Sequence, residues 1–314
     1  MTKYNDNIQG IIWIILGMFV FSIQNIAIKW ISGDYPVLQI VILRSLVALP
    51  LTVLFFQMEG NRGLPSTVQK RLEYTRGFLL FLSYNCYFMG VAALPLAEVA
   101  SIRFSAPLVI TALSVVVLGE KVSARSWLAL LIGFAGVLFI VRPGSASFNL
   151  GSVFILMATL FYASSLMLTR RLRTYDSSAT MAYYCTLVYL ISAFALAPIV
   201  SLVGEAPNAH PSIAFLFRAW SMPALIDFSI MAGLGLVWAV GMFCMAKAYS
   251  LALASVAAPF EYITLPINAM WGYVIWSEIP TFATWIGAGL TLSCGLYILL
   301  RESRAKAEVK VKAA

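Results

Sequence analysis

The sequence predicts an all-α membrane protein with ten transmembrane helices, arranged as two inverted five-helix repeats. Three observations predict this fold class. The 314 residues are 61% hydrophobic and only 11% charged, whereas soluble domains carry about 25% charged residues. Apolar stretches of about 20 residues recur along the chain, each long enough to cross a hydrocarbon core about 30 Å thick. The second half of the chain also repeats features of the first half.

The predicted spans follow one another with short breaks. They are residues 10–31, 36–56, 77–94, 97–118, 125–141, 151–169, 178–202, 224–246, 254–276 and 282–300. Two breaks are very short: the third and fourth spans meet at Leu94-Pro95-Leu96, and the eighth and ninth merge through Tyr249-Ser250-Leu251. Counts of nine or eleven are therefore the alternatives to ten. A polar end follows the first apolar run in place of a small-residue cleavage site, so we expect no removable signal peptide.

The basic residues predict the orientation in the membrane. With the N-terminus in the cytoplasm, 16 of the 21 Lys and Arg residues fall in inner segments, against Arg142 and Arg218 in outer segments. Lys29, Arg44 and Arg103 lie inside spans. This bias follows the positive-inside rule, and we expect both termini to be cytoplasmic. The membrane orientation explains the net charge of +8 without a nucleic-acid partner.

An internal repeat predicts the architecture. A shift of 158 positions aligns Arg103 with Glu261, Glu120 with Glu278 and Trp127 with Trp285. A shift of 141 aligns the first span more weakly with the sixth. Chance similarity between apolar stretches is the alternative explanation. Because five is odd, the second half must enter the membrane from the opposite side, a construction typical of alternating access around a midplane site. The predicted units are residues 1–146, residues 147–301 and a basic tail at 302–314.

The residues indicate no enzyme. The single His210 lies in a predicted outer loop, no glycine-rich phosphate loop follows a strand, and acidic residues inside spans do not cluster. Cys86, Cys185, Cys244 and Cys294 lie in apolar spans without metal-ligand spacing, and we interpret them as packing residues. We therefore predict no metal and no cofactor. A membrane-bound enzyme or a scaffold is the alternative class.

Polar side chains at membrane depth are the candidate functional residues, because they are costly there and face the bundle interior or a wet cavity. Arg44 lies about 8 residues, or ~12 Å, into its span. It either contacts an anionic solute or is permanently paired with a carboxylate or helix carbonyls. Arg103 and Glu261 occupy equivalent repeat positions. Glu261 is the candidate for proton or cation coupling, and a structural counter-ion for an arginine is the alternative role.

Amides and aromatic rings complete the predicted substrate-binding set. The set is Gln24, Asn25, Arg44, Tyr84, Asn85, Arg103, Tyr162, Trp238, Glu261, Tyr262 and Asn268. Its rings suit a planar or amphipathic solute, although many aromatic residues simply pack. Pro107 and Pro266 interrupt the hydrogen-bond ladders of the fourth and ninth spans, as discontinuous transporter helices require, or mark packing kinks.

Three further charged residues are interpreted as structural. We expect Lys29, on the outward half of the first span, to snorkel to the surface. Glu120 and Glu278 end their spans and are interpreted as boundary residues.

Over essentially its whole length, the sequence resembles the EamA-like ten-helix drug/metabolite transporters. The matching features are Arg44 in the second span, Arg76-Gly77 opening the third, the run from Leu94 through Glu98, Pro107 and Gly119-Glu120-Lys121 to Gly133 and Gly136, and the echo from Ala258-Pro259 to Glu278. The second half departs from the first at Ser277 and Glu261.

The resemblance implies a secondary transporter of small organic metabolites in a bacterial inner membrane. It implies a central cavity lined by spans 1, 3, 4, 6, 8 and 9. Residues 247–262 are most similar to carriers of S-adenosylmethionine or riboflavin, and amino-acid or drug export is the alternative. We expect a monomer or homodimer whose partners are the solute and the lipid bilayer.

Overall fold

The computed structural model describes residues 2–103, 149–172, 175–204, 208–251 and 263–279, with single positions and short stretches between 105 and 138 and between 281 and 293. Every regular element within these residues is a helix, which confirms the predicted all-α class. Among the described helices, five are long and apolar enough to cross a membrane. They cover Ile8–Ile31, Val37–Met58, Leu150–Thr169, Ala179–Val203 and Leu225–Met245. These helices correspond to the first, second, sixth, seventh and eighth predicted spans.

The described helices are α1 (Thr2–Ile31), α2 (Val37–Met58), α3 (Lys70–Val91), α4 (Leu96–Arg103), α7 (Leu150–Leu172), α8 (Ser178–Val203), α9 (Pro211–Phe217), α10 (Leu225–Leu251) and α12 (Thr264–Trp276). The short break between α3 and α4 confirms the predicted boundary at Leu94-Pro95-Leu96. In contrast, α10 continues to Leu251, past the predicted end at residue 246, so Tyr249-Ser250-Leu251 is helical. The fifth and tenth predicted spans and most of the fourth lie outside the described ranges.

Pro266 lies in the first turn of α12. At this position a proline does not remove an intrahelical hydrogen bond, because the first backbone N–H groups of a helix have no partner. Pro266 therefore marks where α12 begins. Pro107 lies outside the described residues.

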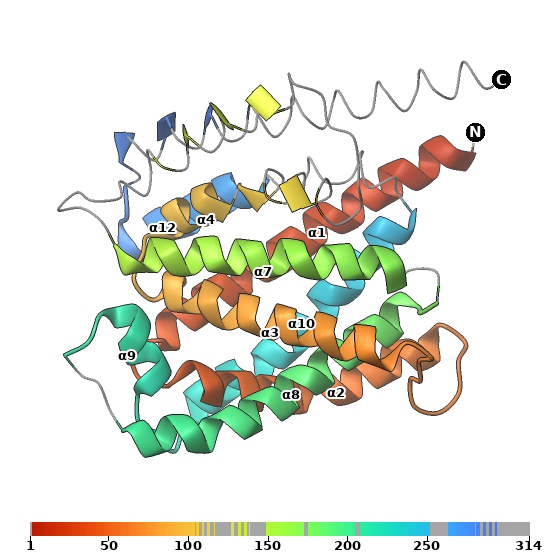
Figure 1. Ribbon diagram of the computed structural model, residues 1–314, viewed down its shortest axis with the longest axis horizontal. Helices are drawn as coiled ribbons and strands as arrows, with labels where there is room; N and C mark the ends of the chain where they lie inside the picture. The colour runs from red at the N-terminus through yellow and green to blue at the C-terminus, as the bar shows by residue number, and fades with distance from the viewer. Residues whose placement is uncertain are drawn as a thin grey trace.

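The helices pack side by side, as Figure 1 shows. α3 packs along α7 and against α8, while α1 packs along α10. α2 lies against α8 and α10, and α12 lies against α4 and α1. The connection at residues 59–69 and the start of α1 lie at one end of the bundle, and α9 lies at the other (Figure 1). We call these the N-terminal end and the α9 end.

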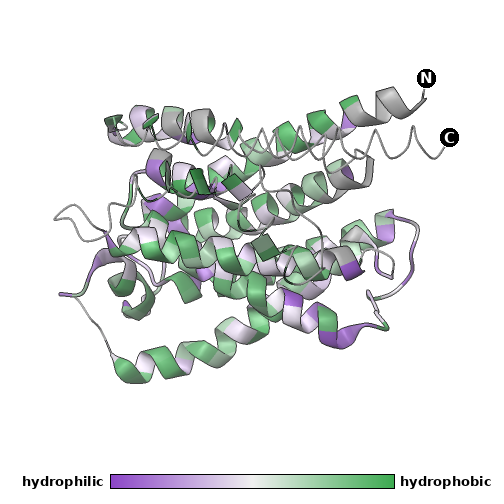
Figure 2. Cartoon of the chain, turned by 45° about the horizontal axis from the view of Figure 1, so that its top comes forward, coloured by the Kyte–Doolittle hydropathy of each residue, from purple (hydrophilic) through white to green (hydrophobic). Residues whose placement is uncertain are grey.

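Apolar side chains cover the outside of the bundle as well as its core. Hydrophobic residues run along the lengths of the helices, and hydrophilic residues gather in connections at the ends (Figure 2). On α8, Phe194 is 54% exposed and Leu202 is 87% exposed. Such a surface is suited to lipid, because monomeric soluble proteins rarely expose large contiguous apolar patches. The chain is therefore a multi-pass membrane protein.

One glycine allows a close helix approach next to the centre of the bundle. A Cβ atom at Gly235 of α10 would lie 2.6 Å from the carbonyl oxygen of Arg44 and 2.7 Å from Cβ of Val47 on α2. Small residues permit this kind of backbone contact in membrane bundles. Gly235 thus sets the separation of α2 and α10 where Arg44 lies.

Candidate functional site

A buried arginine surrounded by aromatic rings lies in the first half of α2. Arg44 is 1% exposed. Its guanidinium carbon lies 4.0 Å from the ring centroid of Tyr84 on α3, 4.2 Å from Trp238 on α10 and 5.3 Å from Tyr189 on α8. A cation over a ring face is attracted by the negative face of the π-system. We call Arg44 and these three rings the arginine cage.

Hydrogen bonds fix two of the cage rings. The Tyr189 hydroxyl donates to the Leu80 carbonyl oxygen at 2.7 Å, and Trp238 Nε1 donates to Thr186 Oγ1 at 3.3 Å. The rings also pack on one another, with the Tyr84 centroid 5.7 Å from Trp238 and 5.5 Å from Tyr189. Contacts within the protein therefore hold the cage rings in place. The structure thus brings the predicted residues Arg44, Tyr84 and Trp238 together.

Tyr189 was not among the predicted site residues. No local signal in the sequence distinguishes it from the other aromatic residues of its span.

Buried amides from α1 and α12 form further polar contacts, and one of them reaches the cage. Gln24 Oε1 accepts from Nη1 of Arg44 at 3.4 Å, and Asn25 Nδ2 donates to Asn268 Oδ1 at 3.4 Å. Asn25 also lies within hydrogen-bonding reach of the Tyr87 side chain. All three amides are at most 5% exposed. The structure thus connects three more predicted residues to the centre of the bundle.

A second arginine lies between two further rings. The guanidinium carbon of Arg103 on α4 lies 4.9 Å from the ring centroid of Tyr87 and 4.7 Å from that of Tyr162 on α7. Tyr84 and Tyr87 are three residues apart on α3, so they lie on one face of that helix. α3 therefore presents one tyrosine to each arginine.

The other predicted residues are Asn85, Glu261 and Tyr262. Asn85 donates to the Phe81 carbonyl oxygen of its own helix at 2.8 Å, and none of its described contacts reaches Arg44 or Arg103. Glu261 and Tyr262 lie outside the described residues.

An ion pair lies near the α9 end. Lys29 Nζ lies 2.5 Å from Glu278 Oε1 and donates to the Leu94 carbonyl oxygen at 3.2 Å. The other carboxylate oxygen of Glu278 accepts from the Leu96 backbone N–H at 3.2 Å, where a negative charge is favourable at the start of α4. The prediction that Lys29 snorkels to the surface is wrong, because its side chain is 13% exposed and its ammonium is paired.

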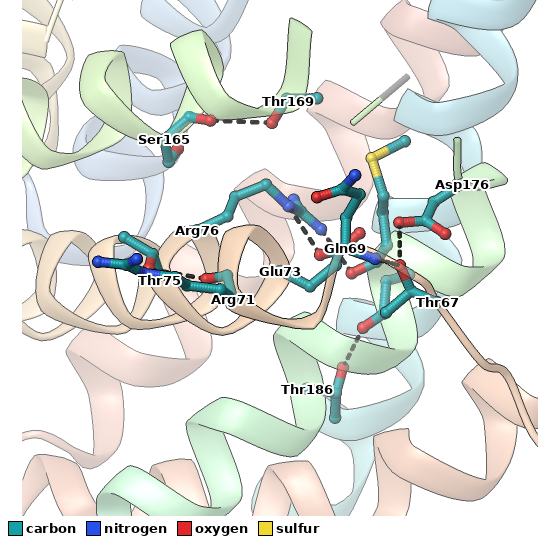
Figure 3. A network of polar contacts seen from close by, with 12 residues as sticks. Thr67, Gln69, Arg71, Glu73, Thr75, Arg76, Ser165, Thr169, Asp176 and Thr186 are labelled. Carbon is teal, nitrogen blue, oxygen red and sulfur yellow. Dashed lines mark hydrogen bonds and ion pairs between the residues drawn. The ribbon is translucent and has the colours of Figure 1, made fainter. Parts of the chain in front are cut away.

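A second polar network lies at the N-terminal end (Figure 3). Arg76 Nε lies 3.1 Å from Glu73 Oε2, and Arg76 Nη2 donates to the Met181 carbonyl oxygen of α8 at 2.6 Å. Thr67 Oγ1 donates to Asp176 Oδ2 at 2.7 Å and joins two connections. Glu73 precedes the apolar stretch at 77–94. Burial raises the pKa of its carboxyl above the ordinary value, and the nearby Arg76 charge offsets part of that rise.

The described cysteines are free thiols, and the histidine caps a helix. Cys185 and Cys244 are buried and Cys86 is half-buried, all three as free thiols. His210 Nδ1 accepts from the Ser212 backbone N–H at the start of α9. Among the described residues, no group of three or more His, Cys, Asp or Glu side chains could hold a metal ion.

The sequence is similar to a known family and to several proteins named as transporters. The model of the EamA-like transporter family matches residues 8–142. A riboflavin transporter of Vibrio cholerae is 26% identical over 97% of both chains. An S-adenosylmethionine uptake transporter of Rickettsia prowazekii is 23% identical over 95% of both chains. The pseudopaline exporter CntI of Pseudomonas aeruginosa is 26% identical over 90% of this chain and 93% of its own.

A solved crystal structure shares the fold. It has a TM-score of 0.62 and 15% identity over 94% of this chain and 98% of its own. At this identity the likeness shows the fold alone. Together with the family model and the relatives that span nearly the whole sequence, it agrees with the helical arrangement described above. Residues 8–142 thus match an EamA-like transporter domain, and over nearly its whole length the chain is similar to proteins named as transporters.

Proposed function

We propose that this protein is a secondary transporter that moves small organic metabolites by alternating access, with the arginine cage and its neighbours as the solute site. The observation that carries the proposal is that α1, α2, α3, α8 and α10 all contribute to one buried cationic centre. Ionisable residues inside membrane bundles typically mark solute or ion pathways. The protein is not an enzyme, since its relatives over nearly the whole chain are named as transporters.

We infer that the bundle has ten spans in two inverted halves, residues 1–146 and 147–301, followed by a tail at 302–314. If α1, α2, α3 and α4 correspond to α7, α8, α10 and α12, helix contacts should occur in mirrored pairs. The α3–α7 contact is mirrored by α10–α1, α2–α10 by α8–α3, and α1–α12 by α7–α4. The α2–α8 and α4–α12 contacts each map onto themselves. These pairings support the repeat.

The polar networks are placed to act as gates between the two halves. Lys29 and Leu96 of the first half hold Glu278 of the second half near the α9 end. At the N-terminal end, Arg76 and Thr67 of the first half bind Met181 and Asp176 of the second. The cage lies between these layers and combines Tyr84 of the first half with rings of the second. Rocking of one half against the other would break one layer while the other stays closed.

The membrane is the bacterial inner membrane, with both termini in the cytoplasm according to the distribution of basic residues. S-adenosylmethionine and riboflavin-like compounds are the first solutes to test, because relatives are named for them. An exporter of amino acids or drugs is the alternative within the same fold.

Transport in sealed liposomes tests the function directly. Purified protein is reconstituted, and the uptake of labelled amino acids, S-adenosylmethionine, riboflavin and nucleosides is compared with uptake into empty vesicles. The proposal predicts faster entry of at least one solute. If no solute in this panel enters faster, the assignment as a metabolite transporter is contradicted.

Coupling is proposed to involve Glu261. The same assay tests this role with Glu261→Gln. A coupling residue should allow exchange of solute but lose accumulation driven by a pH gradient. If Glu261 is only a counter-ion for an arginine, both modes of transport and the stability of the protein should fall together.

A further inference from the structure

Among the described residues, no carboxylate pairs with the charge of Arg44. An arginine side chain stays protonated in proteins, so the 1% exposed Arg44 carries a buried positive charge. The two ion pairs among the described residues join Lys29 to Glu278 and Arg76 to Glu73, and neither includes Arg44. Burying an ion without a counter-ion is strongly unfavourable. A compensating anion is therefore expected at this position.

The cage compensates the charge only in part. Ring faces attract a cation, which lowers the cost of burial but leaves the net charge in place. The single described hydrogen bond of the guanidinium is a long one to Gln24, at 3.4 Å. Arg44 Nε has no hydrogen-bond partner among the described residues. The guanidinium thus keeps donors that could bind an acceptor.

A second free donor lies on the cage wall. The Tyr84 hydroxyl is buried and has no hydrogen-bond partner among the described residues, whereas the Tyr189 hydroxyl and the Trp238 N–H are both already bonded. An unpaired buried donor is itself costly. Two unpaired donors on neighbouring side chains, one of them cationic, match a group that only accepts hydrogen bonds and carries a negative charge.

We propose that Arg44 binds a carboxylate of the transported solute, with Tyr84 as the second donor and the cage rings covering the adjacent part of the solute. This inference rests on the proposed transport function and narrows it to solutes that carry a carboxylate. Guanidinium and carboxylate are geometrically matched, since two N–H groups of the first can bind both oxygens of the second. Neutral solutes would leave the charge of Arg44 uncompensated.

Direct binding separates this proposal from transport itself. Binding of tryptophan, S-adenosylmethionine and riboflavin to detergent-purified protein is measured by calorimetry, and each carboxylate compound is compared with its primary carboxamide. The expected result is binding of a carboxylate compound and a loss of about 10- to 100-fold in affinity for its carboxamide, because hydrogen bonds to charged groups contribute about 1.5–3 kcal/mol. Equal affinity for the two forms would contradict the proposal.

Variants of Arg44 give a second measurement. Arg44→Gln should weaken binding of the carboxylate by the same factor while leaving the thermal stability of the solute-free protein unchanged or higher, because it removes an uncompensated charge. Arg44→Lys should keep part of the affinity, since it keeps the charge but loses the planar donor pair. The matched control is Arg71→Gln, an exposed arginine near the start of α3, which should bind like the wild type.

The outcomes distinguish failure of the carboxylate assignment from failure of the transport function. If the liposome panel shows transport of neutral solutes only, the transport function stands and the carboxylate assignment fails. If Arg44→Gln lowers the stability of the solute-free protein, Arg44 has a permanent carboxylate partner in the chain, and the assignment also fails. If no solute is transported or bound, the proposed function itself fails.

Discussion

The ammonium of Lys29 on α1 lies 2.5 Å from a carboxylate oxygen of Glu278, a residue 249 positions further along the chain. The same carboxylate binds the backbone N–H of Leu96, so a single side chain joins the end of α1, the start of α4 and the end of α12. Lys29 also lies 5.0 Å from the ring centroid of Trp276. Three helices from both halves of the proposed repeat thus meet at this ion pair.

Breaking the Lys29–Glu278 pair should weaken closure near the α9 end. Glu278→Gln leaves the half-buried ammonium of Lys29 without its counter-ion, at a cost of about 1–3 kcal/mol. We expect a lower melting temperature and slower transport, and greater labelling by a thiol reagent of a cysteine introduced at Ser32. The charge swap Lys29→Glu with Glu278→Lys should partly restore the melting temperature and the transport rate, and should partly reverse the increase in labelling. No recovery in the swap would show that the pair is not a gate contact.

Gly235→Ala should separate α2 from α10. The added methyl group would lie 2.6 Å from the Arg44 carbonyl oxygen, and such overpacking costs about 1–3 kcal/mol. A reduced melting temperature and weaker solute binding are expected together, because the displaced backbone carries Arg44. The control is Gly233→Ala on the same helix, where an added Cβ meets no atom within 4 Å. Equal behaviour of the two variants would refute the close contact.

The Glu73–Arg76 pair should make stability depend on pH. Burial raises the folded-state pKa of Glu73 above its ordinary value of 4.5, so the folded protein holds this proton more tightly than the unfolded chain does. The associated stability is present below pH 4.5 and is lost as pH rises through the folded pKa. The melting temperature of the wild type should therefore fall as the pH is raised from 4 through the folded-state pKa of Glu73. Glu73→Gln should not show this fall.

Replacing Arg76 should lower the stability of the protein more than replacing Glu73. Arg76→Met leaves the fully buried Glu73 carboxylate unpaired and also removes the hydrogen bond to Met181. Loss of one partner of a buried pair costs about 3–5 kcal/mol. If Arg76→Met and Glu73→Gln melt at the same temperature, the hydrogen bond from Arg76 to Met181 does not stabilise the contact between α3 and α8.

Reporter fusions test the orientation. Alkaline phosphatase needs the oxidising outer compartment to form its disulfides, so a fusion after Ala314 should be inactive. A fusion after Asn208, in the connection before α9, should be active. High activity after Ala314 would overturn the cytoplasmic position of the C-terminus.

The sequence determined the all-α membrane class and the positions of the spans, because a helix that crosses lipid must meet strict requirements. A span needs about 20 apolar residues with its backbone hydrogen bonds satisfied internally, and this requirement is visible locally. It correctly located α1, α2, α7, α8 and α10. It also singled out Arg44, because a charge within an apolar stretch is conspicuous without any knowledge of its neighbours.

Only the tertiary structure decided which side chains meet. The cage joins residues 44, 84, 189 and 238, and no periodicity distinguishes the Tyr189 ring from the many aromatic side chains that only pack. The position of Lys29 near a span end predicted snorkelling, but its ammonium pairs with Glu278, which follows α12 far along the chain. Pairing of this kind depends on how helices pack across the two halves, and a single span carries no information about its partners.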